Sequence, residues 1–308
     1  MLLFKKLGNF GYKHAKMKKY LLIISLLLVA SVSNADVLDN VSGKISKFAA
    51  DLIPGEGVTE VSIDIEKNSE PSFNILAVRD IDKTENTNFF TQISFHNSDV
   101  SGNERYIGNV GLGYRFLTDD ESMMIGFNSF YDADLTEGHQ RASIGFEARA
   151  STLEFNLNQY HALTGMQKTI NENSASYTDE QALGGLDYRF ASQVPYMPWA
   201  EVSWTGYQIQ SDKAAENIKG DTYSLGLALT PSLQLDLSKD QSDRGTEDVS
   251  GGSLSFIYPP RESKPTLLDG FSDEVWFEES MQNKLSQKVE RNNNLTVEIQ
   301  GAVIFTKK

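Results

Sequence analysis

Histidine, serine and aspartate are the residues of this chain that could combine for hydrolytic chemistry. Beyond residue 35 the histidines are His96, His139 and His161. Residue types that complete a catalytic triad lie close to them in the sequence: Ser98, Asp99, Asp132 and Asp134. A hydrolase site remains open as a remote alternative. The histidines are scattered and fit no fixed catalytic motif, so we predict no enzyme and no catalytic residue.

Metal and cofactor chemistry has little support in the sequence. There is no cysteine, which excludes a disulfide framework, a thiol nucleophile and a thiolate metal site. Asp119, Asp120 and Glu121 form an acidic run, but an acidic run of this length is typical of a solvated tight turn. We therefore predict no metal site and no cofactor.

The charge balance argues against nucleic acid as a partner. Residues 1–35 contain six of the 28 basic residues and none of the 42 acidic ones. Without that segment the net charge is about −20, from 22 basic and 42 acidic residues. Because recognition of phosphate depends on clustered lysine and arginine, nucleic-acid binding is excluded.

The N-terminus has the pattern of a secretory signal. Lys18 and Lys19 form a basic region, residues 20–32 an apolar core, and 33–35 a cleavage site of small residues. We expect translation to start at Met17 and the mature chain to start at Asp36. The apolar core is about 13 residues long, shorter than the roughly 20 that a membrane-spanning helix needs.

The stretch from Arg105 to Arg149 alternates between apolar and polar residues in segments of about ten. Apolar residues keep one parity, as in Val110, Leu112 and Tyr114, and would face lipid. The other parity carries charged and amide residues in strand after strand, which the buried face of a soluble sandwich would not tolerate. We predict a polar lumen lined by Asn109, Arg115, Asn128, Asp132, Arg141, Glu147, Arg149, Glu154, Asn156, Asn158, Asp187, Arg189, Glu201 and Asp236.

The pattern predicts an all-β fold: a 12-stranded antiparallel transmembrane β-barrel over residues 61–258. The expected strands are 61–66, 73–80, 88–96, 105–116, 122–132, 140–149, 152–162, 180–190, 197–209, 220–229, 233–239 and 248–258. Short periplasmic turns and longer outer loops, such as 97–104 and 163–179, agree with this order.

Short periplasmic helices are expected on both flanks of the barrel. Residues 36–60 contain an amphipathic helix that ends at Pro54-Gly55. Residues 259–308 contain a second helix, over 270–288. The tail 294–305 alternates again and, on its own, is compatible with a terminal strand that closes the barrel.

Several segments together resemble the β-domain of the intimin and invasin proteins, the inverse autotransporters. They include FFTQISFHNSD at 89–99, GFNSFYDAD with RASIGFEAR between 126 and 149, and KVERNNNLTVEI at 288–299. The match covers about residues 70–300. The resemblance implies twelve strands, a periplasmic helix, and a linker through the pore that includes Val289, Arg291, Asn292, Asn293 and Leu295.

Intimins and invasins continue into adhesin domains, whereas this sequence stops at Lys308. We therefore expect a translocator in the outer membrane of a Gram-negative bacterium that exports a separately encoded, adhesin-like passenger. The expected partners are outer-membrane lipid, the barrel assembly machinery, periplasmic chaperones and the passenger. The alternative function is a structural or adhesive barrel that uses its outer loops.

Overall fold

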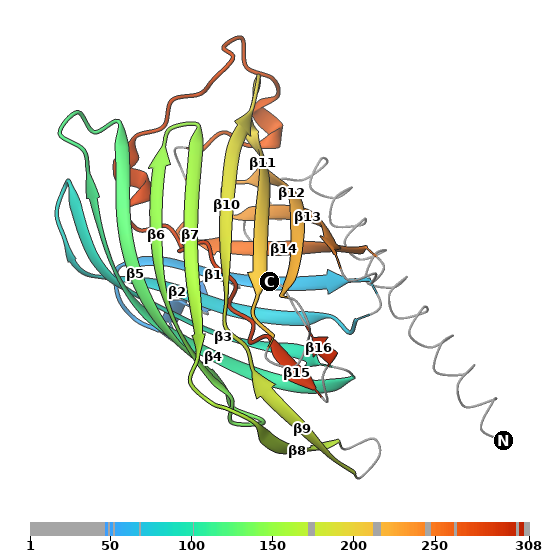
Figure 1. Cartoon of the computed structure of the whole chain (residues 1–308). Helices are drawn as coiled ribbons and strands as arrows, with labels where there is room; N and C mark the ends of the chain where they lie inside the picture. Colours follow the sequence, from blue (N-terminus) through green and yellow to red (C-terminus); the bar gives the residue numbers. More distant parts are fainter. Residues whose placement is uncertain are drawn as a thin grey trace.

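The chain forms a closed antiparallel β-barrel between Gly57 and Tyr258 (Figure 1). The structure is a computed structural model that describes residues 47–48, 50–51, 53–67, 69–100, 102–171, 176–211, 217–243, 248–261, 264–299 and 302–304. The wall consists of β1 (Gly57–Glu66), β2 (Ser72–Lys83), β3 (Thr87–Val100), β4 (Asn103–Leu117), β5 (Met123–Asp134), β6 (Gln140–Ala150), β7 (Leu153–Ala162), β10 (Gly185–Val194), β11 (Met197–Ile209), β12 (Ile218–Thr230), β13 (Leu233–Ser242) and β14 (Val249–Tyr258). These twelve strands confirm the predicted fold class.

Each strand pairs with its neighbour in the chain, and β1 pairs with β14 to close the barrel. We call the end where β1 starts and β14 finishes the turn end; its connections are 84–86, 118–122, 151–152, 195–196 and 231–232. The opposite, loop end holds 67–71, 101–102, 135–139, 163–184, 210–217 and 243–248. The longest connection therefore lies at the loop end, after β7.

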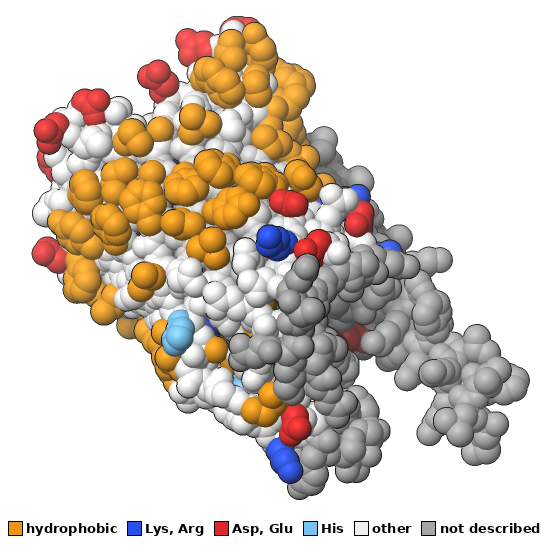
Figure 2. Space-filling model, viewed as in Figure 1, with side chains coloured by type: hydrophobic (Ala, Val, Ile, Leu, Met, Phe, Trp, Pro, Cys, Tyr) orange, Lys and Arg blue, Asp and Glu red, His pale blue; other side chains and the backbone are white. Residues whose placement is uncertain are grey.

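An apolar band crosses the face of the wall seen in Figure 2, and most wall strands carry exposed apolar side chains, as the alternation predicted. Val110 and Leu112 on β4 are 47% and 49% exposed, whereas Asn109, the residue directly before Val110, is only 3% exposed. Aromatic rings pack against one another along the band; the ring centroids of Phe155 and Phe190, on neighbouring strands, are 4.8 Å apart. The outer surface thus matches hydrocarbon, and the polar parity faces inward.

A separate four-stranded sheet lies at the loop end, in the order β16-β15-β9-β8. It consists of β8 (Gln167–Asn171), β9 (Ser176–Ala182), β15 (Val297–Ile299) and β16 (Ala302–Ile304). The strands β8 and β9 form a hairpin within the connection between β7 and β10 (Figure 1). β15 adds to the free edge of β9.

Some sequence expectations were wrong in detail. The predicted strand 180–190 is two elements, because Leu183 and Gly184 break the chain between β9 and β10. Most of the expected outer loop 97–104 belongs to strands, since β3 continues to Val100 and β4 begins at Asn103. The tail 294–305 does not close the barrel, because β15 and β16 belong to the external sheet.

The expected helix over 270–288 is also wrong. Described residues there form an extended segment with a 3-10 turn, η2 (Met281–Lys284), preceded by η1 (Leu267–Asp269). The segment follows the rim, where Tyr196 and Gln193 bond to its backbone; these contacts replace the internal bonds of a helix. Residues 47, 48, 50 and 51 of the expected N-terminal helix are helical. Its earlier residues and the signal segment lie outside the described part.

Across the described ranges, no helix has the length and apolar character to cross a membrane.

Candidate functional site: the occupied pore

Residues 289–296, which we call the pore linker, run through the lumen from the turn end to the loop end (Figure 1). At one end Val289 N donates to Gln92 on β3 at 2.8 Å. At the other, Leu183 N donates to Thr296 O at 2.9 Å. Val289 and Leu295 are each 3% exposed. The linker is therefore enclosed by the barrel and is not part of its wall.

An aspartate on the wall holds Arg291 in the lumen. The guanidinium donates to both carboxylate oxygens of Asp132, at 3.0 and 2.7 Å, and to Ser143 Oγ at 3.1 Å. Asp132 also accepts from Arg141 Nε at 2.9 Å. All four side chains are buried. Because a buried charge that loses its partner is strongly destabilising, this pair fixes the linker at one register.

Other wall residues bind the linker through its backbone. Asn158 Nδ2 donates to Glu290 O at 3.1 Å. Further along the linker, Arg141 Nη2 donates to Asn292 O at 2.7 Å. Asn109 Nδ2 donates to Asn293 O at 3.0 Å. These contacts satisfy the polar groups of an extended chain that has no secondary-structure partner in the lumen.

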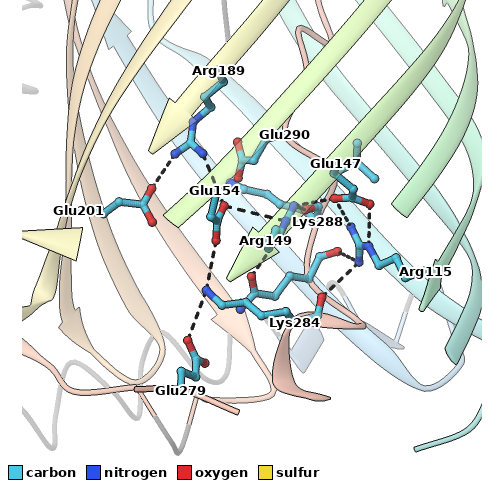
Figure 3. Close-up of polar contacts among 12 residues, drawn as sticks. Arg115, Glu147, Arg149, Glu154, Arg189, Glu201, Glu279, Lys284, Lys288 and Glu290 are labelled. Atoms are coloured by element: carbon cyan, nitrogen blue, oxygen red, sulfur yellow. Dashed lines mark hydrogen bonds and ion pairs between the residues drawn. The ribbon is translucent and has the colours of Figure 1, made fainter. Parts of the chain in front are cut away.

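A second ionic cluster lies near the turn end (Figure 3). Arg115 Nε donates to Glu147 at 2.7 Å, and Arg149 lies 2.9 Å from the same carboxylate. The two arginines also donate to linker-side carbonyls, Arg115 to Leu285 O at 2.9 Å and Arg149 to Lys288 O at 2.8 Å. One carboxylate thus orients two guanidinium groups that hold the chain as it enters the lumen.

Glu154 on β7 extends this cluster along the wall to the neighbouring strands β10 and β11 (Figure 3). It accepts from Lys284 Nζ at 3.1 Å and lies 3.5 Å from Arg189 Nη1. Arg189 in turn donates to Glu201 at 2.6 Å, and Lys284 lies 3.3 Å from Glu279. Acidic and basic side chains of the wall and of the segment that precedes the linker therefore alternate across the turn end.

Three aromatic rings in the lumen were missed by the sequence reasoning. Phe90, Phe130 and Tyr160 are buried on the inner face. Guanidinium carbons of Arg115, Arg291 and Arg141 lie 4.3, 4.2 and 4.2 Å from their respective ring centroids. A cation over an aromatic face is stabilised by the ring quadrupole, more strongly when it is desolvated. These rings therefore help the carboxylates to hold charge in the lumen.

The glycines that face these rings are a signal in the sequence that could have indicated them. A Cβ atom at Gly113 would overlap the ring of Phe90, and one at Gly111 would overlap Phe130. Both glycines are on the inner parity of β4, where a side chain would displace the ring. The glycine pattern in the family-like segment thus has a packing cause.

A cavity of about 920 Å³ remains beside the linker. The linker borders one side of it, and the strands β1 and β10–β14 border the other with small and acidic residues, among them Ser203, Ser224, Ser238 and Ser253. Its lining extends from Pro259 at the turn end to Glu70 at the loop end. The linker is therefore seated against one side of the lumen and does not fill it.

The remaining predicted lumen residues have varied surroundings. Asp187 accepts from Asn158 at 2.7 Å and from Tyr160 OH at 2.6 Å, and Asp236 borders the cavity. Asn128 and Asn156 are buried in the wall, and their side-chain amides have no hydrogen-bond partner in the described part of the chain. The structure thus brings most of the predicted residues to the linker or the cavity, whereas in the described part of the chain the amides of these two asparagines hydrogen-bond to neither.

The histidines are not brought together. His96 Nε2 lies 2.6 Å from Asn294 Oδ1 of the linker, and His139 Nε2 lies 3.2 Å from Glu180. His161 is exposed on β7. Asp120 is used within its own turn, where hydroxyl and backbone donors of Thr118 and Ser122 lower the pKa of its carboxyl to about 2.

Comparisons with known proteins agree with this architecture. The family model "Inverse autotransporter, beta-domain" matches residues 29–293. The chain is 30% identical to the inverse autotransporter adhesin YeeJ of Escherichia coli K12 over 68% of this chain and 9% of YeeJ. It is also 30% identical to invasin of Yersinia enterocolitica, over 50% of this chain and 18% of invasin. The chain therefore spans less than a fifth of the length of these relatives.

A solved structure reported as "Unveiling the Mechanism Behind the in-meso Crystallization of Membrane Proteins" has the same fold. Its TM-score is 0.61 at 20% identity, over 79% of this chain and 100% of that one. Because the family model covers most of the sequence, and the barrel matches the fold, the outer membrane of a Gram-negative bacterium is its location. The chain belongs to the inverse autotransporter β-domain family.

Proposed function

We propose that this barrel is a translocator that passes polypeptide in extended form through its lumen. The observation that carries the proposal is the linker seated in the pore, with its carbonyls bonded by Arg141, Asn109 and Asn158. Backbone contacts of this kind suit an extended chain of many sequences, because every residue offers the same carbonyl. We assign the loop end to the cell exterior, since longer loops lie outside in such barrels.

The cargo that we propose is a separately encoded, adhesin-like protein. Two observations support this choice: relatives of the chain are named as an adhesin and an invasin, and the cavity beside the linker extends along the lumen. An extended strand of a second chain fits such a space better than a folded domain does. Serine hydroxyls and carboxylates on β11–β14 supply hydrogen-bond partners for its backbone.

A cavity-filling variant tests the proposal. We expect Ser238→Trp, on the cavity side of β13, to reduce the surface-exposed fraction of a co-expressed, tagged adhesin-like passenger. The matched control is Leu237→Trp, one residue away and 44% exposed on the lipid face. Surface protease digestion of intact cells measures the exposed fraction. Equal export by both variants would contradict passage through the cavity.

The second candidate function is adhesion by the barrel itself. The observation that favours it is the hairpin β8–β9, which projects from the loop end (Figure 1). If the loops bind cells directly, deleting the hairpin would abolish adhesion while leaving passenger export intact. The same pair of measurements therefore separates the two candidates.

A further inference from the structure

The pore linker does not end in solvent when it leaves the lumen. It continues into β15, which pairs antiparallel with β9 in the register Val297↔Ala182, Glu298↔Gln181 and Ile299↔Glu180. The β9 edge thus accepts the first residues beyond the pore as an added strand. In strand addition, main-chain hydrogen bonds supply affinity and side-chain pockets supply register.

Side chains on β15 and on the linker just before it fix this register. On one face, Gln181 Nε2 and Ser211 Oγ donate to the two carboxylate oxygens of Glu298, at 3.2 and 3.1 Å. Glu298 is only 1% exposed. Before β15, the linker residue Leu295 packs with Ala182 and with Ile107 of the wall. A slip by one residue would bury the wrong side chain in each place.

A buried ionic cluster fastens β9 to the rim of the barrel. Arg105 on β4 donates to both oxygens of Glu180, in one case at 2.8 Å, and to Asp134 at 3.1 Å. His139 and Thr169 also contact the Glu180 carboxylate, at 3.2 and 3.4 Å. Glu180 is 1% exposed. Hydrogen bonds from Arg105 and His139 hold the pKa of this carboxyl at about 2, so the Glu180 carboxylate stays ionised at neutral pH.

We propose that the β9 edge is an exit-side acceptor for an extended polypeptide segment, and that Glu180 is the positioning residue that holds this edge over the pore. The occupant in this chain is its own segment 297–299. The inference rests on the proposed translocator function, because an acceptor at the exit retains what the pore delivers. An acidic residue at the position of Glu298 sets the register.

The ionic cluster around Glu180 fixes the position of the β9 edge at the pore exit. A two-stranded hairpin alone is marginally stable in water. Glu180 ties the hairpin to two neighbouring wall strands through Arg105 and Asp134, so β9 has a fixed position before any strand is added. A preformed edge avoids the entropic cost of ordering at the moment of capture.

Engineered disulfides test the acceptor in the full chain, which has no native cysteine. Ala182→Cys with Val297→Cys places two thiols at directly opposite positions, where Cα separations of roughly 4.5–5.5 Å allow a disulfide. We expect near-complete cross-linking in outer membranes under mild oxidation. The control pair, Ala182→Cys with Ile299→Cys, leaves Glu298 in place but is two positions out of register, with Cα atoms about 7–8 Å apart, and should not cross-link. Equal yields from the two pairs would overturn the strand pairing.

The positioning role of Glu180 is tested in the same background. Glu180→Gln should slow formation of the 182–297 disulfide at least tenfold, because the carboxylate that binds Arg105 is lost. Asp179→Asn, an exposed neighbour on the other face of β9, should leave the rate unchanged. If both variants cross-link at the parental rate, Glu180 does not position the edge. Heat-modifiable mobility confirms that each variant has folded.

Passenger export is measured beside cross-linking to separate the two proposals. Intact export without the 182–297 disulfide would overturn the acceptor and leave the translocator standing. If the cysteine-free chain exports no passenger, while the double-cysteine chain cross-links and is slowed by Glu180→Gln, the acceptor contacts are supported and the translocator is contradicted.

Discussion

Removal of the Asp132 charge should release the pore linker without unfolding the barrel. In Asp132→Asn, Arg291 loses a carboxylate that it contacts through two bonds, at 3.0 and 2.7 Å. Arg141 loses the same partner. Breaking a buried charge pair by removing one partner costs about 3–5 kcal/mol. At 1.4 kcal/mol per factor of ten, the opening equilibrium of the linker should rise by about two to four decades.

A single thiol reports this opening. Val289→Cys is close in size to the original residue, which is 3% exposed and packs in the lumen. We expect a water-soluble maleimide to label it slowly in the parent and at least a hundred times faster with Asp132→Asn. Arg291→Gln alone should also accelerate labelling. The double variant should be labelled more slowly than the sum of the two single-variant free-energy changes predicts, because the two side chains are coupled.

Two results would refute this reasoning. Asp82→Asn, an exposed carboxylate at the turn end of β2, is the matched control and should leave the labelling rate unchanged. If Asp132→Asn labels no faster than Asp82→Asn, the linker does not depend on the buried pair. If the effects of Asp132→Asn and Arg291→Gln simply add, the two side chains do not act on each other.

Three further outcomes follow from the same geometry. Val202→Arg, at a lipid-facing position that is 46% exposed, should lower the stability of the barrel by about 2–4 kcal/mol if it lies near the midplane. Ser203→Arg faces the cavity and should assemble normally. Urea titration of heat-modifiable mobility measures both. In the same titration, Gly113→Ala should destabilise the barrel by about 1–3 kcal/mol through overpacking on a ring, while Gly252→Ala, with ordinary contacts, should have little effect. The Glu180 carboxyl, with its pKa lowered from 4.5 to about 2, stabilises the folded hairpin fully above its unfolded pKa, so amide exchange of β9 should be constant from pH 5 to 8, after correction for intrinsic exchange. Protection should decline only as the pH falls from about 4.5 toward 2.

The wall of the barrel could be predicted from the sequence because strand periodicity is local. Side chains alternate across a strand, so Val110 and Leu112 faced lipid in the prediction and do so in the structure. The same parity placed Arg115 and Glu147 inside, where they form an ion pair. Strand number followed from this pattern, and the resemblance to inverse autotransporters agreed with it.

The aromatic lumen residues could not be predicted from hydropathy alone. Phe90 and Phe130 are apolar, yet they point inward because a guanidinium lies over each ring and a glycine faces it on β4. These contacts join residues on different strands with the linker. A single strand carries no sign of them except the parity and the unexplained glycines.

The segment 270–288 was wrongly expected to be a helix because its apolar residues have helical spacing. In the structure these residues serve different surfaces: Phe271 lies against Trp199 at the rim, whereas Met281 and Leu285 pack on Leu117 and Met124 inside the turn end. An extended chain can reach both places, and a helix cannot. Tertiary contacts therefore decided this segment, and its sequence period was misleading.

The most direct test of the central claim is the single-channel conductance of the chain with residues 289–308 deleted. If the linker occupies the pore, the truncated protein should retain its heat-modifiable mobility and conduct ions more freely than the full chain, because the wall strands between Gly57 and Tyr258 are complete without it. Loss of folding would mean that the segment is needed to complete the wall, since a barrel with an open edge is not tolerated in lipid. A folded barrel with unchanged conductance would contradict a pore that the linker obstructs.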